Sequence, residues 1–105
     1  MDSPTTAGRW WAEATAPELA SLDPERTVVV LPVAAIEQHG PHLPLATDAI
    51  VADALVRHAV ATPRPVARVL ALPTLAIGHS LEHERFAGTL SASAETLLAL
   101  WGDVA

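Results

Sequence analysis

Apolar side chains form continuous runs at two places along the chain, and these runs predict β-strands. The first run covers residues 27–33 and is rich in valine, and the second covers residues 66–72 and is interrupted by Arg68. Strands that are apolar on both faces are typical of a parallel sheet covered by helices. We therefore expect two buried parallel strands.

Between and after these runs, apolar positions recur at helical spacing. One apolar stripe runs from Asp48 to Val60, and a second helix is expected after Ser93, whose hydroxyl suits a helix cap. Thr15 and Glu18 have the spacing of a capping box, which predicts a short helix over residues 16–22. The order strand, helix, strand, helix describes a βαβ unit of the α/β class with a right-handed crossover.

The two ends of the chain differ in character. Residues 1–9 are small and polar, so we expect a flexible N-terminus there and an α/β domain over residues 10–105. Trp10 and Trp11 stand at the start of that domain. We interpret both tryptophans as packing residues, either within the domain or at a subunit contact.

The composition excludes several classes of function. The chain has 105 residues, with 12 acidic and 6 basic side chains and a net charge of −6. Nucleic acids and anionic membranes need clustered cations, so we expect neither as a partner. Cysteine is missing, which removes thiolate metal sites and thiol nucleophiles. No secretory signal pattern opens the chain, and its longest apolar run, residues 28–36, is too short for a bilayer, so a cytoplasmic protein is expected.

The first polar loop, residues 36–47, follows the first predicted strand and offers a candidate metal site. Glu37 and His39 are two residues apart, so in extended backbone they project to the same side. Asp48 begins the next helix and can reach back toward them across the loop. Carboxylates and imidazole suit zinc, manganese or iron(II). The alternative is structural: a helix-capping Glu37, a solvated His39, and an Asp48 that favours the helix N-terminus by its charge.

The second polar loop, residues 77–88, follows the second predicted strand. It contains no complete nucleophile elbow around Ser80 and no second histidine of a zincin helix. Two interpretations stay open for its polar residues, a substrate pocket or hydrogen bonding within the loop. The residues concerned are His79, Ser80, Glu82 and His83.

Two motifs in these loops resemble those of a known family. Residues 31–48 read Leu-Pro-Val-Ala-Ala-Ile-Glu-Gln-His-Gly-Pro-His-Leu-Pro-Leu-Ala-Thr-Asp, which closely resembles the N-terminal motif of the creatininase (creatinine amidohydrolase) family. Residues 78–83 and 86–91 resemble its second motif, with Ala87 where proline is usual. The resemblance runs from about Trp10 to the end of the chain.

The resemblance implies a fold and a metal centre. The family fold is a three-layer α/β/α sandwich with a mostly parallel sheet, of which this chain would hold the N-terminal half, and its members commonly form hexamers. Carried over by position, Glu37 would bind one divalent ion, His39 a second, and Asp48 would bridge the pair. Zinc, manganese and iron(II) all fit this set of ligands.

The resemblance also implies hydrolysis of C–N bonds, with three alternatives for this chain. The main expectation is a metal-dependent amidohydrolase acting on a small-molecule amide through an activated water. The second is a peptidase acting on a mycofactocin-type precursor peptide. The third is a truncated, catalytically incomplete fragment that acts at most as an assembly partner. The family's later histidine and acidic residue have no counterpart here, so we expect the isolated chain to bind metal weakly and hydrolyse little.

Overall fold

The structure is a computed structural model that describes residues 8–64 and 67–105. The chain divides into two compact units, and each is described by itself. The first unit comprises Met1–Pro32 and Ala54–Pro73, and the second comprises Val33–Asp53 and Thr74–Ala105. The helix α2 (Thr47–Ala61) contributes its second half to the first unit and its first half to the second unit.

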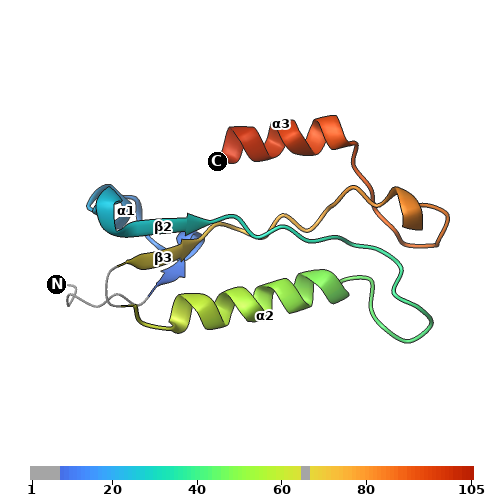
Figure 1. The fold of residues 1–105 in the computed structure, drawn as a ribbon, viewed down its shortest axis with the longest axis horizontal. Helices are drawn as coiled ribbons and strands as arrows, with labels where there is room; N and C mark the ends of the chain where they lie inside the picture. The colour runs from blue at the N-terminus through green and yellow to red at the C-terminus, as the bar shows by residue number, and fades with distance from the viewer. Residues whose placement is uncertain (1–7, 65–66) are drawn as a thin grey trace. The chain divides into compact units, whose positions relative to one another are not determined.

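A three-stranded parallel sheet forms the centre of the first unit. Its strands are β1 (Arg9–Trp10), β2 (Thr27–Val30) and β3 (Arg68–Ala71), in the order β1-β3-β2 (Figure 1). The two parallel strands expected from the apolar runs are confirmed, and α2 connects them. Together with the helices, the parallel sheet establishes an α/β fold.

Both long strands are shorter than the apolar runs that predicted them. β2 ends at Val30 and β3 ends at Ala71, and a proline follows each strand two residues later, at Pro32 and Pro73. Proline has no N–H to donate to the ladder, so regular pairing stops at these positions. Val66, the expected first residue of the second strand, lies outside the described residues.

Strand β1 was not expected, because residues 1–9 were predicted to be flexible. Arg9 pairs with Leu70 and Trp10 with Ala71. The N–H of Gly8 donates to the carbonyl oxygen of Val60 at 2.7 Å. A side chain at position 8 would overlap the carbonyl oxygen of Val69, so only glycine lets the chain approach β3 closely enough to begin β1. The remaining residues of that predicted N-terminal segment, 1–7, lie outside the described residues.

The core of the first unit lies between the sheet and the second half of α2. Its buried members are Val60 from the helix and Val69 and Ala71 from β3. Trp10 packs against this cluster, which fits the packing role predicted for it. Leu70, in the middle of the sheet, is fully buried.

A short helix and a turn connect β1 to β2. The helix α1 (Ala16–Ala20) has the predicted capping box, in which Thr15 and Glu18 bond to each other's backbone N–H. Arg9 of β1 donates to the Glu18 carboxylate at 2.7 Å, which fixes α1 to the strand. The 3-10 turns η1 (Trp11–Glu13) and η2 (Pro24–Arg26) complete the connection.

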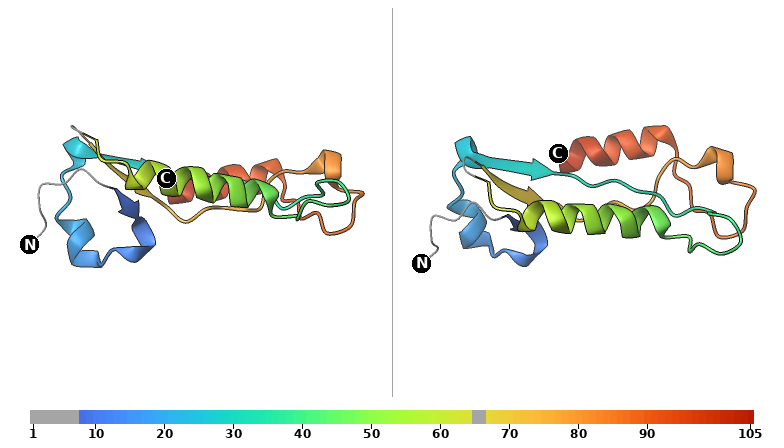
Figure 2. Two further views of the ribbon diagram at one scale, coloured as in Figure 1. Left: turned by 90° about the horizontal axis from the view of Figure 1, so that it is seen from below. Right: turned by 60° about the horizontal axis from the view of Figure 1, so that its bottom comes forward.

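The second unit is built on two extended segments that run side by side (Figure 2). Val33 and Leu75 form a parallel bridge, and the N–H of Ala34 donates to the Leu75 carbonyl at 2.9 Å. Gly78 fits here because a Cβ at this position would lie 3.0 Å from the Ala34 carbonyl oxygen.

The second unit also contains the C-terminal helix. α3 (Ala94–Val104) begins where it was predicted, with the Ser93 hydroxyl accepting from the N–H of Thr96 at 3.1 Å. Its Leu97 is buried. Across the described ranges 8–64 and 67–105, none of the helices has the length and apolar character needed to cross a membrane.

Candidate metal centre

The first polar loop folds back on itself, and this brings Asp48 close to Glu37. Gly40 takes a positive φ of 77°, which glycine adopts without strain. The N–H of Glu37 then donates to the Leu45 carbonyl at 3.1 Å, across the loop. Thr47 closes the turn by donating through its hydroxyl to the Pro44 carbonyl at 2.6 Å. The first turn of α2 therefore places Asp48 beside Glu37 and His39.

His39 lies between two hydrogen-bond acceptors. Its Nδ1 is 2.9 Å from the backbone carbonyl oxygen of Glu37, and its Nε2 is 3.1 Å from Oδ1 of Asp48. The hydrogen bond to the Glu37 carbonyl is the largest cause of a raised pKa at His39; the Asp48 carboxylate adds to it and partial burial opposes both. Because both ring nitrogens face oxygens that only accept, Nε2 needs either a proton or a cation between it and Asp48.

This donor set fits a divalent cation. One ligand atom from each of Glu37, His39 and Asp48 lies within 4.8 Å of the others. A metal-binding histidine typically donates its second ring N–H to a carbonyl or carboxylate, as Nδ1 of His39 does to Glu37. The fold thus brings together the three residues that the sequence grouped as ligands.

A second group of possible ligands shares Glu37 with the first. It combines Glu37 with Glu82 and His83, again with ligand atoms within 4.8 Å of one another. Nε2 of His83 is 3.9 Å from Oε1 of Glu37, and the Glu37 side chain is only 14% exposed. The Nδ1 atom of His83 is buried and has no hydrogen-bond partner within the described ranges. Glu82 and His83, grouped by the sequence only as pocket or loop residues, therefore lie beside the candidate metal ligands.

His79 and Ser80 are held by hydrogen bonds within the second unit. Nδ1 of the exposed His79 is 2.9 Å from the Ala92 carbonyl oxygen. Ser80 is 1% exposed, and its N–H donates to the Ser91 hydroxyl at 2.9 Å. Both partners follow the second loop in the chain, so these two bonds connect the loop to the segment before α3.

Contacts between the first polar loop and the residues just after the second loop bring the two ligand groups together. The N–H of Gln38 donates to the Thr89 hydroxyl at 3.1 Å, and the N–H of Leu90 donates to the Ile36 carbonyl at 2.9 Å. These partners are about fifty residues apart in the chain, and no short spacing reveals their pairing. Sequence reasoning therefore missed that Glu37 belongs to both groups.

Comparison with known proteins identifies the family. A family model described as creatinine amidohydrolase matches residues 12–105. The chain belongs to the creatininase family. The match includes both polar loops and every candidate ligand described above.

Three mycobacterial proteins, each named mycofactocin precursor peptide peptidase, are similar to this creatininase-family chain. The Mycobacterium tuberculosis H37Rv protein is 43% identical over 93 residues, which make up 83% of this chain and 36% of that protein. The Mycobacterium ulcerans protein is 44% identical over 94 residues, covering 83% of this chain and 36% of the relative. The Mycolicibacterium smegmatis protein is 42% identical over 95 residues, covering 85% of this chain and 37% of the relative. The chain thus spans just over a third of the length of the curated relatives it matches.

The structure explains why glycine stands at position 88 of the second creatininase motif. Gly88 has a positive φ of 88°, and a Cβ there would lie 2.5 Å from a methyl carbon of Leu45. Glycine at this position therefore allows the second loop to pack directly on the first. Ala87, where the family usually has proline, is exposed just before this contact.

Proposed function

We propose that this chain carries part of the active site of a metal-dependent hydrolase that cleaves a C–N bond in a precursor peptide. The observation that carries the metal dependence is the convergence of Glu37, His39 and Asp48 within 4.8 Å. The names of the three relatives support the peptide substrate. Those names favour a peptidase over the small-molecule amide that was the main expectation from the family resemblance.

In this proposal, Glu37, His39 and Asp48 are ligands of a divalent-metal centre. Oxygen and imidazole donors suit zinc, manganese and iron(II) alike. When bound, such an ion lowers the pKa of a water and polarises the scissile carbonyl. Glu37 contributes twice, because its backbone carbonyl orients the His39 ring while its carboxylate faces His83.

We further propose two ions per site. The family resemblance assigns Glu37 and His39 to different ions, with Asp48 between them. Glu37 belongs to two ligand groups, and together these groups offer more ligands than one ion needs. This supports a site for two ions. Glu82 and His83 then lie where they either ligate the second ion or orient the Glu37 carboxylate.

We also propose that the intact family domain, as a cytoplasmic homo-oligomer, provides the remaining ligands and the substrate groove. Hexamers are the state that the family resemblance implies. Light scattering on the full-length protein measures this state directly, and a monomer would contradict the proposal.

The deciding experiment separates metal binding from catalysis. Calorimetric titration of the 105-residue chain with Zn²⁺ and Mn²⁺ is expected to give weak binding that His39→Ala weakens further. His58→Ala, an exposed histidine on α2, is the matched control and is expected to leave binding unchanged. Binding that is unchanged by His39→Ala would contradict the proposed ligand set.

Substrate class requires the full-length protein. Its hydrolysis of a precursor peptide and of creatinine is compared by mass spectrometry in the presence of Mn²⁺ or Zn²⁺. We expect cleavage of the peptide, and cleavage of creatinine alone would favour the small-molecule alternative. Absence of both activities in a metal-loaded full-length protein would favour the third alternative, a non-catalytic assembly partner.

A further inference from the structure

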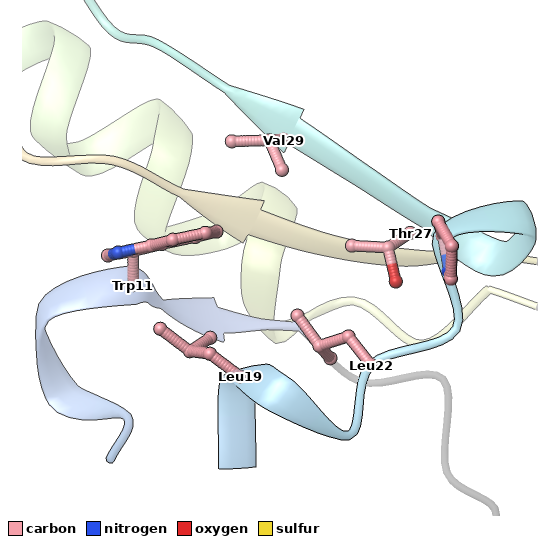
Figure 3. A pocket seen from close by; sticks show the side chains of 6 residues that line it. Trp11, Leu19, Leu22, Thr27 and Val29 are labelled. Atoms are coloured by element: carbon pink, nitrogen blue, oxygen red, sulfur yellow. The ribbon is translucent and has the colours of Figure 1, made fainter. Parts of the chain in front are cut away.

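The hollow of the first unit and the polar loops of the second unit differ in their chemistry. An apolar hollow of about 310 Å³ is bordered by side chains from η1, α1 and β2 (Figure 3). Trp11, Leu19 and Val29 are among its lining residues, and none of those residues carries a charge. The second unit, in contrast, holds a buried ring nitrogen at His83, next to a proposed metal ligand.

His83 is held in place by the turn that contains it. It ends the 3-10 turn η3 (Leu81–His83), where its N–H donates to the Ser80 carbonyl at 3.1 Å. Its own carbonyl accepts from the N–H of Phe86 at 3.0 Å. The rings of His83 and Phe86 are tilted by 50°, with their centroids 6.3 Å apart. Backbone bonds and the neighbouring ring therefore limit where the His83 imidazole can point.

The two nitrogens of the His83 ring have different surroundings. Nε2 lies 3.9 Å from Oε1 of Glu37, whose side chain is only 14% exposed. Nδ1 is buried and has no hydrogen-bond partner within residues 8–64 and 67–105. The Glu37 carboxylate is therefore on the Nε2 side of the ring.

These surroundings determine which nitrogen of His83 carries the ring proton. In a neutral imidazole one nitrogen has the proton and the other has a lone pair. A proton on Nδ1 would leave a buried N–H without an acceptor, and the Nε2 lone pair would face a negatively charged oxygen. A proton on Nε2 avoids both, because the N–H then faces the carboxylate as a charge-assisted donor. The Nε2–H tautomer is therefore the favoured one.

His39 provides the contrast within the same unit. Its Nδ1 has an acceptor, the Glu37 carbonyl oxygen at 2.9 Å, so a proton there leaves the Nε2 lone pair available for a cation. A cation at Nε2 of His83 would instead require a proton on Nδ1, which has no acceptor among the described residues. The two histidines thus suit different tasks, His39 as a ligand and His83 as a donor.

We propose that His83 is a positioning residue, which donates its Nε2–H to Oε1 of Glu37 and so orients this carboxylate toward the metal. The inference rests on the proposed metal centre of Glu37, His39 and Asp48. The separation of 3.9 Å is longer than a hydrogen bond, and the His83 side chain, 32% exposed, has room to close it. A carboxylate held at one oxygen presents the other oxygen to the cation, and such outer partners strengthen metal binding.

The tautomer of His83 is tested in the metal-free 105-residue chain at about pH 8, where an ordinary imidazole is neutral. Long-range proton–nitrogen correlation NMR distinguishes a protonated ring nitrogen from a bare one. We expect a protonated Nε2 at His83, and the same pattern after Zn²⁺ is added. A bare Nε2 in the metal-free chain, or an Nε2 that loses its proton to zinc, would overturn the proposal.

Two variants identify the acceptor. Glu37→Ala removes the carboxylate and is expected to raise the fraction of the Nδ1–H tautomer of His83. Glu82→Ala, which removes the exposed acidic neighbour of His83, is the matched control and is expected to leave the tautomer unchanged. Equal responses to the two variants would contradict donation to Glu37.

Metal affinity separates a positioning residue from a ligand. His83→Ala is expected to raise the Kd for Mn²⁺, measured by calorimetric titration, by about 10-fold. His83→Gln keeps an N–H donor in place of Nε2 and is expected to recover most of this loss. His58→Ala on α2 is the control and is expected to leave the Kd unchanged.

The positioning role and the metal centre fail in different ways. Equal losses of affinity in His83→Gln and His83→Ala would make His83 a ligand and overturn the positioning role, while the metal centre stands. Unchanged affinity in both would show that His83 does not act through Glu37. Unchanged affinity in His39→Ala would contradict the metal centre and, with it, the effect of His83 on metal binding.

Discussion

Nε2 of His39 lies 3.1 Å from Oδ1 of Asp48, while Nδ1 of the same ring faces the backbone carbonyl of Glu37. The ring therefore has a fixed orientation before any cation binds. A cation at Nε2 replaces a proton there and leaves the second ring hydrogen bond intact. Ligand preorganisation of this kind lowers the cost of binding, because the side chains need not be ordered again.

Loss of the Asp48 carboxylate should weaken metal binding. Asp48→Asn keeps the shape of the side chain but removes its negative charge, so we expect the Kd for Mn²⁺ or Zn²⁺ to rise at least about 10-fold. The measurement is calorimetric titration of the purified chain. Asp103→Asn, an exposed residue of α3, is the control and is expected to leave the Kd unchanged.

Metal affinity should fall as the pH is lowered, because the proton competes for Nε2 of His39. The pKa of His39 is raised, first by the Glu37 carbonyl and further by the Asp48 carboxylate. Competition therefore begins at a higher pH than for an unperturbed histidine near 6.5. Titration of the His39 ring signals by NMR in the metal-free chain is expected to give a midpoint above 6.5. A midpoint at or below that value would contradict the geometry described.

The raised pKa of His39 also affects the stability of the metal-free chain. Lower pH favours the folded chain, whereas it weakens metal binding. A raised folded-state pKa means that the folded chain binds the proton more tightly than the unfolded chain does. The contribution of His39 is therefore fully present below about pH 6.5 and is lost as the pH rises through the folded-state pKa. Asp48→Asn should reduce this dependence in part, since the Glu37 carbonyl remains. Urea unfolding at several pH values measures the effect.

Glycine at position 8 should be essential for β1. In Gly8→Ala the added methyl group would overlap the Val69 carbonyl oxygen, so the strand must move away from β3. We expect a loss of about 1–3 kcal/mol in the free energy of unfolding. Gly102→Ala is the matched control, because nothing lies within 4 Å of a Cβ at that helical position. The control should gain about 0.5–1 kcal/mol, and a similar loss in both variants would contradict the close approach at Gly8.

The Glu18 carboxylate should stabilise the chain only above its own pKa. That pKa is lowered, first by the backbone N–H of Thr15, then by the Thr15 hydroxyl and by Arg9. Because the folded-state pKa lies below the unfolded one, the contribution is present above about 4.5 and is lost as the pH falls through the lowered value. Glu18→Gln should reduce stability at neutral pH and flatten its decline in acid. Glu84→Gln, which is exposed in the second loop, is the control for general charge effects.

Much of this architecture could be predicted because it depends on local patterns. The strands around Val29 and Val69, the helix α2 and the capped start of α3 all follow from residues close together in the chain. The first ligand group was also predictable, since one loop joins Glu37 to Asp48. These features need no knowledge of distant contacts.

The features that were missed depend on contacts between distant parts of the chain. The two-residue strand β1 has no periodicity of its own and forms because Gly8 allows it to approach β3. The position of His83 beside Glu37 depends on the contact of two loops. Gly8, two residues before the tryptophan pair, was a signal for the first, and the Gly-Thr-Leu segment after His83 was a signal for the second.

The hydrogen bond from Gln38 to the Thr89 hydroxyl has a consequence for the order of folding. It closes a separation of 51 residues, whereas only 9 residues separate His39 from Asp48. The entropy lost on closing a loop grows with the logarithm of its length, so the shorter closure costs less and can form earlier. We therefore expect Glu37, His39 and Asp48 to come together first, and His83 to join them only after the longer loop has closed. A cation captured by the early group would already be bound when the second polar loop arrives.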